Sequence, residues 1–85
     1  MSSAFRTAVS RTVDRETRAA AIDRLAEEGD TANLRLLVQT GGIHAGLRRQ
    51  ALSRLADAGA SAELQRVTAD RTVDEQLRTE AQRRV

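Results

Sequence analysis

The chain has no cysteine, no proline and no lysine, and Phe5 is the single aromatic residue among its 85 residues. The lack of cysteine excludes a disulfide framework and thiol chemistry. Nothing in the sequence reads as an alternating apolar and polar run, so strand signals are weak. No apolar stretch approaches the roughly 18 residues of a membrane-spanning helix, and the first 16 residues do not resemble a secretory signal. We therefore expect a small, all-helical, cytoplasmic protein.

The charge balance argues against a polyanion binder. All 14 basic residues are arginine, and the 12 acidic residues leave a formal net charge of +2. The sequence pI of about 10.9 is high because no lysine, tyrosine or cysteine titrates between neutral pH and the guanidinium range. A charge of +2 attracts phosphate only weakly. Arginine without lysine, beside abundant alanine, is typical of a GC-rich genome.

A 30-residue internal period organises the chain. The letters RTVD stand at residues 11–14 and return 60 positions later, at 71–74. "TRAAAIDRLAEEGDTANLRLLV" begins at Thr17, its partner "LRRQALSRLADAGASAELQRVT" begins at Leu47, and "LRTEAQRRV", from Leu77, begins a third copy. RTVD is therefore one junction seen twice, two periods apart, and the intermediate junction reads GGIH at 41–44.

Each period divides into two predicted helices with one apolar face. The first carries Ala21, Ile22, Leu25 and Ala26; the second carries Leu34, Leu37 and Val38, matched by Leu64, Val67 and Thr68. Residues 3–10 fit as a second helix without its first partner. The sequence thus predicts one all-α domain over 1–85, a right-handed α-solenoid of about six short helices: half a repeat, two full repeats and a further half.

The predicted helix ends have their own signals. Gly29 and Gly59 stand where a helix favours a left-handed terminating residue. Asp14 and Asp74 are expected to cap the first helices. Asp30 and Ser61 are expected to cap the second helices.

The repeat resembles short HEAT-like repeats of the type named after phycobilisome lyases. One matching motif, D-x-x-x-R-x-x-A, opens the repeat. It consists of Asp14, Arg18 and Ala21 in one copy and of Asp74, Arg78 and Ala81 in another. The other matching segments are "LAEEGD" at 25–30 and "LADAGA" at 55–60. The second unit departs from it, with His44 in the aspartate position and Gly46 in the first helical turn. The resemblance implies a protein-binding scaffold. It implies no lyase chemistry, because nothing here resembles a bilin site.

No residue pattern predicts catalysis, a cofactor or a metal. His44 is the one histidine, so it lacks the partner ligands of a zinc site and the arrangement of a nucleophilic triad. The segment "TGGIHAGLR" lacks the lysine and the spacing of a phosphate-binding loop. We expect His44 to be a helix-start residue and the protein not to be an enzyme.

The outer face of the second helices is the candidate surface for a protein partner, bound as a peptide or a helix. The predicted contact residues are Arg6, Thr7, Arg35, Leu36, Gln39, Gln65, Arg66 and Ala69. Leu36 is the unusual member, an apolar residue where the period places Arg66.

Two alternatives stay open. Arg48, Arg49 and Arg54 form a run without an acidic residue that would suit nucleic acid through phosphate contacts. The two bare ends of a short array would suit self-association.

Arginine also recurs in two rows across the repeats, at 18, 48 and 78 and at 24, 54 and 84. We interpret both rows as structural. Each arginine would pair with an aspartate of its own unit and with neighbouring carbonyls, holding the units in register.

Overall fold

A computed structural model describes residues 3–85, so the first two residues of the expected 1–85 domain lie outside the described residues. Six helices follow one another: α1 (Ser3–Val9), α2 (Arg15–Glu27), α3 (Thr31–Val38), α4 (Ala45–Asp57), α5 (Ser61–Ala69) and α6 (Glu75–Arg84). The all-α class and the six short helices are confirmed. No helix in the described part of the chain is long and apolar enough to cross a membrane.

The helix starts repeat the sequence period. Helices α2, α4 and α6 begin at Arg15, Ala45 and Glu75, and α3 and α5 begin at Thr31 and Ser61, so equivalent helices start 30 residues apart. The period in the sequence is therefore a period in the backbone.

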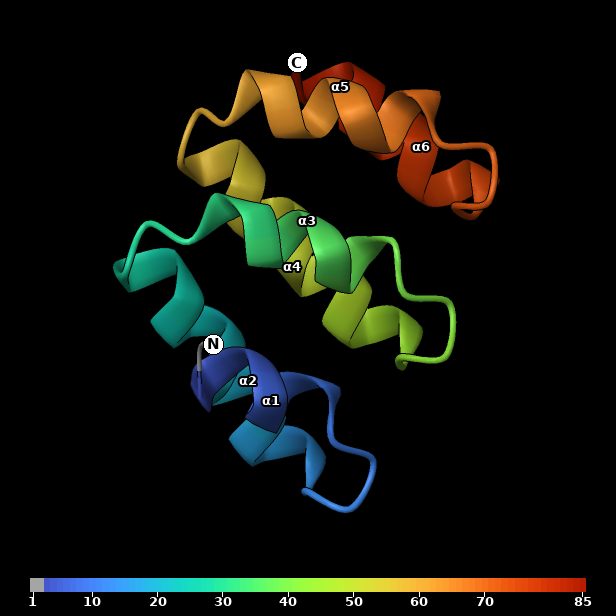
Figure 1. Cartoon of the computed structure of the whole chain (residues 1–85). Helices are drawn as coiled ribbons and strands as arrows, with labels where there is room; N and C mark the ends of the chain where they lie inside the picture. Colours follow the sequence, from blue (N-terminus) through green and yellow to red (C-terminus); the bar gives the residue numbers. More distant parts are fainter. Residues whose placement is uncertain (1–2) are drawn as a thin grey trace.

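The closest packing joins helices across the RTVD and GGIH junctions. These hairpins are α1 with α2, α3 with α4, and α5 with α6, and they stack through α2–α4–α6 on one side and α1–α3–α5 on the other. Figure 1 shows the two layers, with α1, α3 and α5 in front and the chain ends at opposite ends of the stack. The two half repeats and two full repeats of the sequence thus pack as three helical hairpins.

The core consists of alanine, leucine, isoleucine and valine from all six helices and two of the junctions. Leu25 and Leu55 are completely buried, as is Ala51, whose small side chain lets neighbouring helices approach closely. Phe5 and Val9 of α1 are only partly buried, although they pack against this core. Among the described helices, α1 packs against α2 and α3.

The junctions explain why the RTVD letters recur. Val13, Ile43 and Val73 occupy the same place in three similar turns, and each backbone N–H donates to the carbonyl three residues earlier, at 3.1 to 3.3 Å. Ile43 and Val73 are buried in the core, and Val13 is half-buried. The third letter is therefore a core residue at the GGIH junction and at the second RTVD junction, which the sequence pattern did not reveal.

Most of the expected helix boundaries are confirmed. Gly29 and Gly59 have φ values of 70° and 66°. Asp14 caps α2 by accepting from the Thr17 N–H, at 3.1 Å, and Asp74 caps α6 by accepting from the Gln76 N–H, also at 3.1 Å.

The second-helix caps differ from each other. Asp30 caps α3 by accepting from the Asn33 N–H, at 3.3 Å. The expected cap at Ser61 is wrong, because Ser61 is the first helical residue and Ala60 holds the cap position without any side-chain hydrogen bond. The backbone is ready for a cap: φ and ψ are −80° and 66° at Ala60 and −85° and 68° at Asp30.

The arginines at 18, 48 and 78 have the structural role that we inferred, but each donates to a backbone carbonyl and not to an aspartate. Arg48 Nε donates to the Ile43 carbonyl at 3.1 Å and Arg78 Nε to the Val73 carbonyl at 3.0 Å, whereas Arg18 Nε donates to Ala8 at 2.9 Å. The expected ion pairs with the capping aspartates are not among those formed by residues 3–85. The capping carboxylates are turned toward backbone N–H groups of their own helices instead.

An added cap on α5 should stabilise the protein. We expect Ala60→Asn to raise the free energy of unfolding by about 0.5–2 kcal/mol, because asparagine would satisfy an unpaired N–H of the first helical turn. Asparagine is preferred to aspartate because the Glu63 carboxylate lies three residues on. Urea denaturation followed by circular dichroism measures the change. The matched control is Ala62→Asn, which places the same residue at an exposed position inside the first turn of α5. An equal effect of the two variants on the free energy of unfolding would contradict capping.

Candidate partner-binding surface

The layer of α1, α3 and α5 carries the predicted contact residues, and they differ in exposure. Arg6, Leu36, Gln65, Arg66 and Ala69 are exposed, whereas Thr7, Arg35 and Gln39 are half-buried. All eight belong to this layer, but they are not equally available to a partner.

Arg35 and Gln39 are tied to the next hairpin. Arg35 Nε donates to Glu63 Oε1 at 2.7 Å, and both side chains are only 18–19% exposed. Arg35 also donates to Gln39 at 3.0 Å, and the Gln39 amide donates to Asp70 Oδ2 at 3.0 Å. These bonds fasten α3 to α5, so the two residues support the surface and are not free to bind a partner directly.

The acceptors Glu63 and Asp70 were missed by the sequence reasoning. It treated each helix face separately, whereas these bonds run between repeats. The signal was the period itself: Glu63 and Asp70 follow their donors by 28 and 31 residues, close to one repeat.

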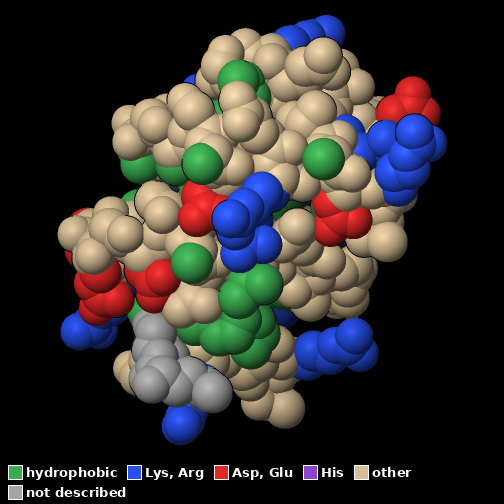
Figure 2. All heavy atoms as spheres, turned by 45° about the horizontal axis from the view of Figure 1, so that its top comes forward, with side chains coloured by type: hydrophobic (Ala, Val, Ile, Leu, Met, Phe, Trp, Pro, Cys, Tyr) green, Lys and Arg blue, Asp and Glu red, His purple; other side chains and the backbone are tan. Residues whose placement is uncertain are grey.

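Leu36 is exposed, as expected, at 40% of its surface. Together with Val85 it is one of two large hydrophobic residues exposed among residues 3–85. The partly buried Phe5 and Val9 belong to α1, which packs against α3. Figure 2 shows hydrophobic side chains gathered beside the N-terminal end of this layer, next to a basic group flanked by acidic ones. The layer therefore combines an apolar patch with a fixed polar rim.

The arginine run on α4 is not a free basic patch. Arg48 is occupied by the Ile43 carbonyl. Arg54 Nε donates to Asp23 Oδ1 at 2.8 Å, and its Nη1 donates to Asp57 at 3.2 Å. Of the three arginines, Arg49 alone is exposed and without such a partner in the described structure. The run does not form a row of three available guanidinium groups.

In the row at 24, 54 and 84, Arg54 and Arg84 join neighbouring repeats, but through an aspartate of the preceding unit and not, as expected, only of their own. Asp23 accepts from Arg54 and also from the Gln50 amide at 3.0 Å, and Gln50 donates to the Ala19 carbonyl at 3.0 Å. These bonds join α2 to α4. Arg84 lies 3.8 Å from Asp57, across the next boundary, whereas Arg24 pairs within its own helix with Glu28.

These contacts shift the acidity of two aspartates. The hydrogen bond from Arg54 is the main cause that lowers the pKa of Asp23, with a further contribution from Gln50. The Thr72 hydroxyl and N–H lower the pKa of Asp70, which also accepts from Gln39. Both carboxylates therefore stay ionised and bonded at neutral pH.

His44 begins a helix, as expected. It is the N-cap of α4, and its Nδ1 accepts from the Gly46 N–H at 2.9 Å. Within residues 3–85, no three histidine, cysteine or carboxylate side chains come together in a way that could hold a metal ion.

Comparison with known proteins finds no matching family model, no matching curated protein and no matching solved structure.

The Asp23–Arg54 bond should give stability a specific pH dependence. The folded-state pKa of Asp23 lies below its usual value, so the bond stabilises the protein above the unfolded-state pKa of about 3.9 and is lost as the pH falls through the folded-state pKa. Asp23 is half-exposed, so the bond contributes little. We expect the free energy of unfolding of the wild type to exceed that of Asp23→Asn by at most about 1 kcal/mol at pH 7.

Thermal denaturation at pH values from neutral down to well below the unfolded-state pKa tests this prediction. The difference in stability between the wild type and Asp23→Asn should shrink toward zero in acid, because Asp23 is then protonated. Glu27→Gln is the matched control, because the exposed Glu27 joins none of the ion pairs in the described chain. A gap of constant size at every pH would contradict the assignment.

Proposed function

We propose that the protein is a non-catalytic interaction module that binds a peptide or helix of a partner protein on the α1–α3–α5 layer. The observation that carries this proposal is the exposed Leu36 at the centre of that layer, beside a rim held in place by Arg35 and Gln39. An apolar anchor surrounded by ordered polar groups is the usual composition of a protein interface.

The rigidity of the surface supports the proposal. Three bonds fix Arg35, Gln39 and Glu63 before any partner arrives, so few side chains on this layer must be ordered on binding. Side-chain ordering costs about 0.5–1.5 kcal/mol per group, and a prepared surface avoids part of that cost. The resemblance to HEAT-like repeats, which are protein-binding scaffolds, points in the same direction.

The contact set follows from these roles. Leu36 would be the apolar anchor, and the exposed Arg66 and Gln65, with Ala69, would form the edge over α5. Arg6 and Thr7 would extend the surface over α1, while Arg35 and Gln39 would position the rim.

Two observations favour this proposal over nucleic-acid binding. Arg48 and Arg54 are engaged inside the protein, which leaves Arg49 alone of the proposed basic patch. Acidic groups on the α3–α5 layer, Glu63 and Asp70, lie among the arginines of that layer. Interleaved charge suits a protein partner better than a phosphate backbone.

The charges also argue against end-to-end stacking in the repeat register. A second copy continuing the array would bring its Arg24 to the place that Arg54 takes against Asp23. The residue two periods after Asp23 is Arg83, so two arginines would face each other. The bond that joins α2 to α4 cannot form between copies in this arrangement.

A paired substitution on the proposed surface tests the function. The wild-type protein is used to capture partners from a lysate of the native host. We expect the double variant Leu36→Glu, Arg66→Glu to lose these partners, because it buries a carboxylate at the interface and replaces a positive charge by a negative one. Quantitative mass spectrometry of the captured proteins is the measurement.

The matched control carries the same kinds of change on the other layer, Ala20→Glu with Arg24→Glu on α2, both at exposed positions. It should keep the wild-type set of partners. A set of partners that is unchanged by the Leu36 and Arg66 pair would contradict the proposal.

A further inference from the structure

The junction turns show which residues of α1, α3 and α5 are equivalent. The same backbone hydrogen bond closes all three turns, and its acceptor carbonyls lie 30 residues apart, at Ser10, Thr40 and Asp70. Burial follows the same spacing, since Ala4, Leu34 and Leu64 are all buried. The 30-residue register therefore continues through the first junction into α1, without a residue gained or lost.

The donors that fasten α3 to the next hairpin are replaced by apolar residues in α1. Arg35 and Gln39 donate across that boundary at 2.7 Å and 3.0 Å. Thirty residues earlier stand Phe5 and Val9, whose side chains carry no hydrogen-bond donor. Both are partly buried and pack against the core. The boundary between α1 and α3 is therefore apolar at the positions where the next boundary is polar.

The acceptors of these bonds are replaced as well. In α3 and the turn after it, the equivalent positions are held by Asn33 and Thr40, which form local hydrogen bonds. The Asn33 amide donates to Asp30 at 2.8 Å, and the Thr40 hydroxyl donates to the Leu36 carbonyl at 2.6 Å. Neither of the two bonds that join α3 to the next hairpin can therefore form between α1 and α3.

Leu36 extends this apolar boundary to the surface of the layer. It is 40% exposed, and Figure 2 shows hydrophobic side chains gathered at the N-terminal end of the layer. In the 30-residue register, Leu36 lies between Arg6 of α1 and Arg66 of α5. Because α1, α3 and α5 stack in this order, the exposed row is arginine, leucine, arginine.

The charge beside this row is positive. The three helices contain three arginines and one glutamate. That glutamate, Glu63, is bound by Arg35 at 2.7 Å and lies 4.0 Å from Arg66, whose side chain is 65% exposed. Arg6 is exposed and has no hydrogen bond or ion pair in the described part of the chain. Two guanidinium groups are thus available on either side of Leu36.

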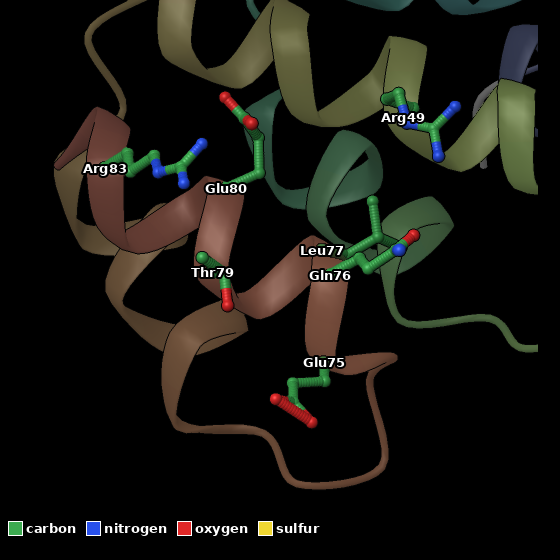
Figure 3. A pocket seen from close by; sticks show the side chains of 7 residues that line it. All are labelled: Arg49, Glu75, Gln76, Leu77, Thr79, Glu80 and Arg83. Atoms are coloured by element: carbon green, nitrogen blue, oxygen red, sulfur yellow. The ribbon is translucent and has the colours of Figure 1, made fainter.

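The hollow on the opposite layer shows no such excess of one charge. It lies between α4 and α6, has a volume of about 560 Å³ and is lined by two arginines and two glutamates among its seven residues. Figure 3 shows its arginines, Arg49 on α4 and Arg83 on α6, with Glu80 between them. Arg49 and Arg83 are exposed and serve as matched controls for Arg6 and Arg66.

A helix suits this layer better than an extended strand. The backbone groups of α1, α3 and α5 are bonded within their own helices, so the layer has no free edge to which a strand could add. A partner helix satisfies its own backbone hydrogen bonds and presents only side chains. The contact is then decided by apolar packing and by charge.

We propose that the partner segment is an acidic amphipathic helix. Its apolar face packs on Phe5, Val9 and Leu36, and carboxylates on both sides of that face pair with Arg6 and Arg66. The inference rests on the proposed function and names the chemistry of its partner. Hydrogen bonds between guanidinium and carboxylate are charge-assisted, and complementary charges on both sides of an apolar contact fix the register of a complex.

Selection from a library of random peptides displayed on phage tests the charge preference. Wild type should enrich peptides with apolar residues at i and i+4 flanked by aspartate or glutamate. Arg6→Glu with Arg66→Glu should instead enrich lysine and arginine at the flanks, because the charge of the row is reversed. Arg49→Glu with Arg83→Glu changes the net charge equally on the other layer and should enrich the same sequences as wild type.

A variant that copies the α3–α5 boundary tests the apolar contact. Phe5→Arg with Asn33→Glu would place between α1 and α3 the pair that Arg35 and Glu63 form one repeat later. The peptide most enriched by wild type, labelled for fluorescence anisotropy, should bind this variant about tenfold more weakly, while helical circular dichroism stays that of wild type. Val9→Thr, a milder change of similar shape, should weaken binding about threefold.

The outcomes separate this inference from the proposed function. Enrichment of neutral or basic sequences by wild type, no enrichment at all, or an unchanged preference after reversal of Arg6 and Arg66 would overturn the inference. If the enriched peptides still lose binding to Leu36→Glu, the surface binds a partner of another chemistry and only the inference fails. Peptides that bind Leu36→Glu as tightly as wild type would count against the proposed function as well.

Discussion

The structure depends on the burial of small aliphatic side chains between successive helical hairpins. Leu25 and Leu55 are completely buried, yet each belongs to a helix with one broad exposed side. No hairpin has enough apolar surface to form a core alone, so each depends on its neighbour, as in other stacked arrays. Alanines at the contacts let the backbones approach, which gives leucine and valine the contacts that larger aromatic residues would otherwise provide.

Polar bonds across the boundaries fix how the hairpins stack. Arg35 and Glu63 do so on one layer, and Arg54 and Asp23 on the other. The side chains are partly exposed, so their energetic contribution is modest. Their directional geometry selects one stacking register among the several that an alanine-rich core would permit.

The sequence was sufficient to predict the period, the six helices and most helix ends, because these follow from local signals such as glycine and aspartate. It was insufficient wherever the answer depended on a second repeat. Ser61 seemed a cap by residue type, but the backbone places Ala60 there. Arg35 and Gln39 were predicted to face a partner, and they instead reach across to Glu63 and Asp70. The buried roles of Ile43 and Val73 were hidden in letters that read as a turn.

The candidate surface includes one of the breaks in the period. Leu36 stands where the next repeat has Arg66, and Ser53 stands where the previous one has Asp23. Polar residues such as Arg35 and Arg54 form bonds between neighbouring repeats. Leu36, which departs from the period, exposes an apolar side chain. Ser53, which also departs from it, cannot form the bond that Asp23 forms, and Arg84 lies near Asp57 instead. The two departures fall on different layers.

The equal spacing of the starts of α2, α4 and α6 has a consequence for how such a chain can change in length. A tandem copy of one repeat, made in frame by unequal recombination of the gene, would carry its own turn, glycine terminator and junction residue. It would meet neighbours of the kind that already surround it, and the residues outside it would keep their surroundings. Longer or shorter descendants of this protein are thus within reach of a single genetic event.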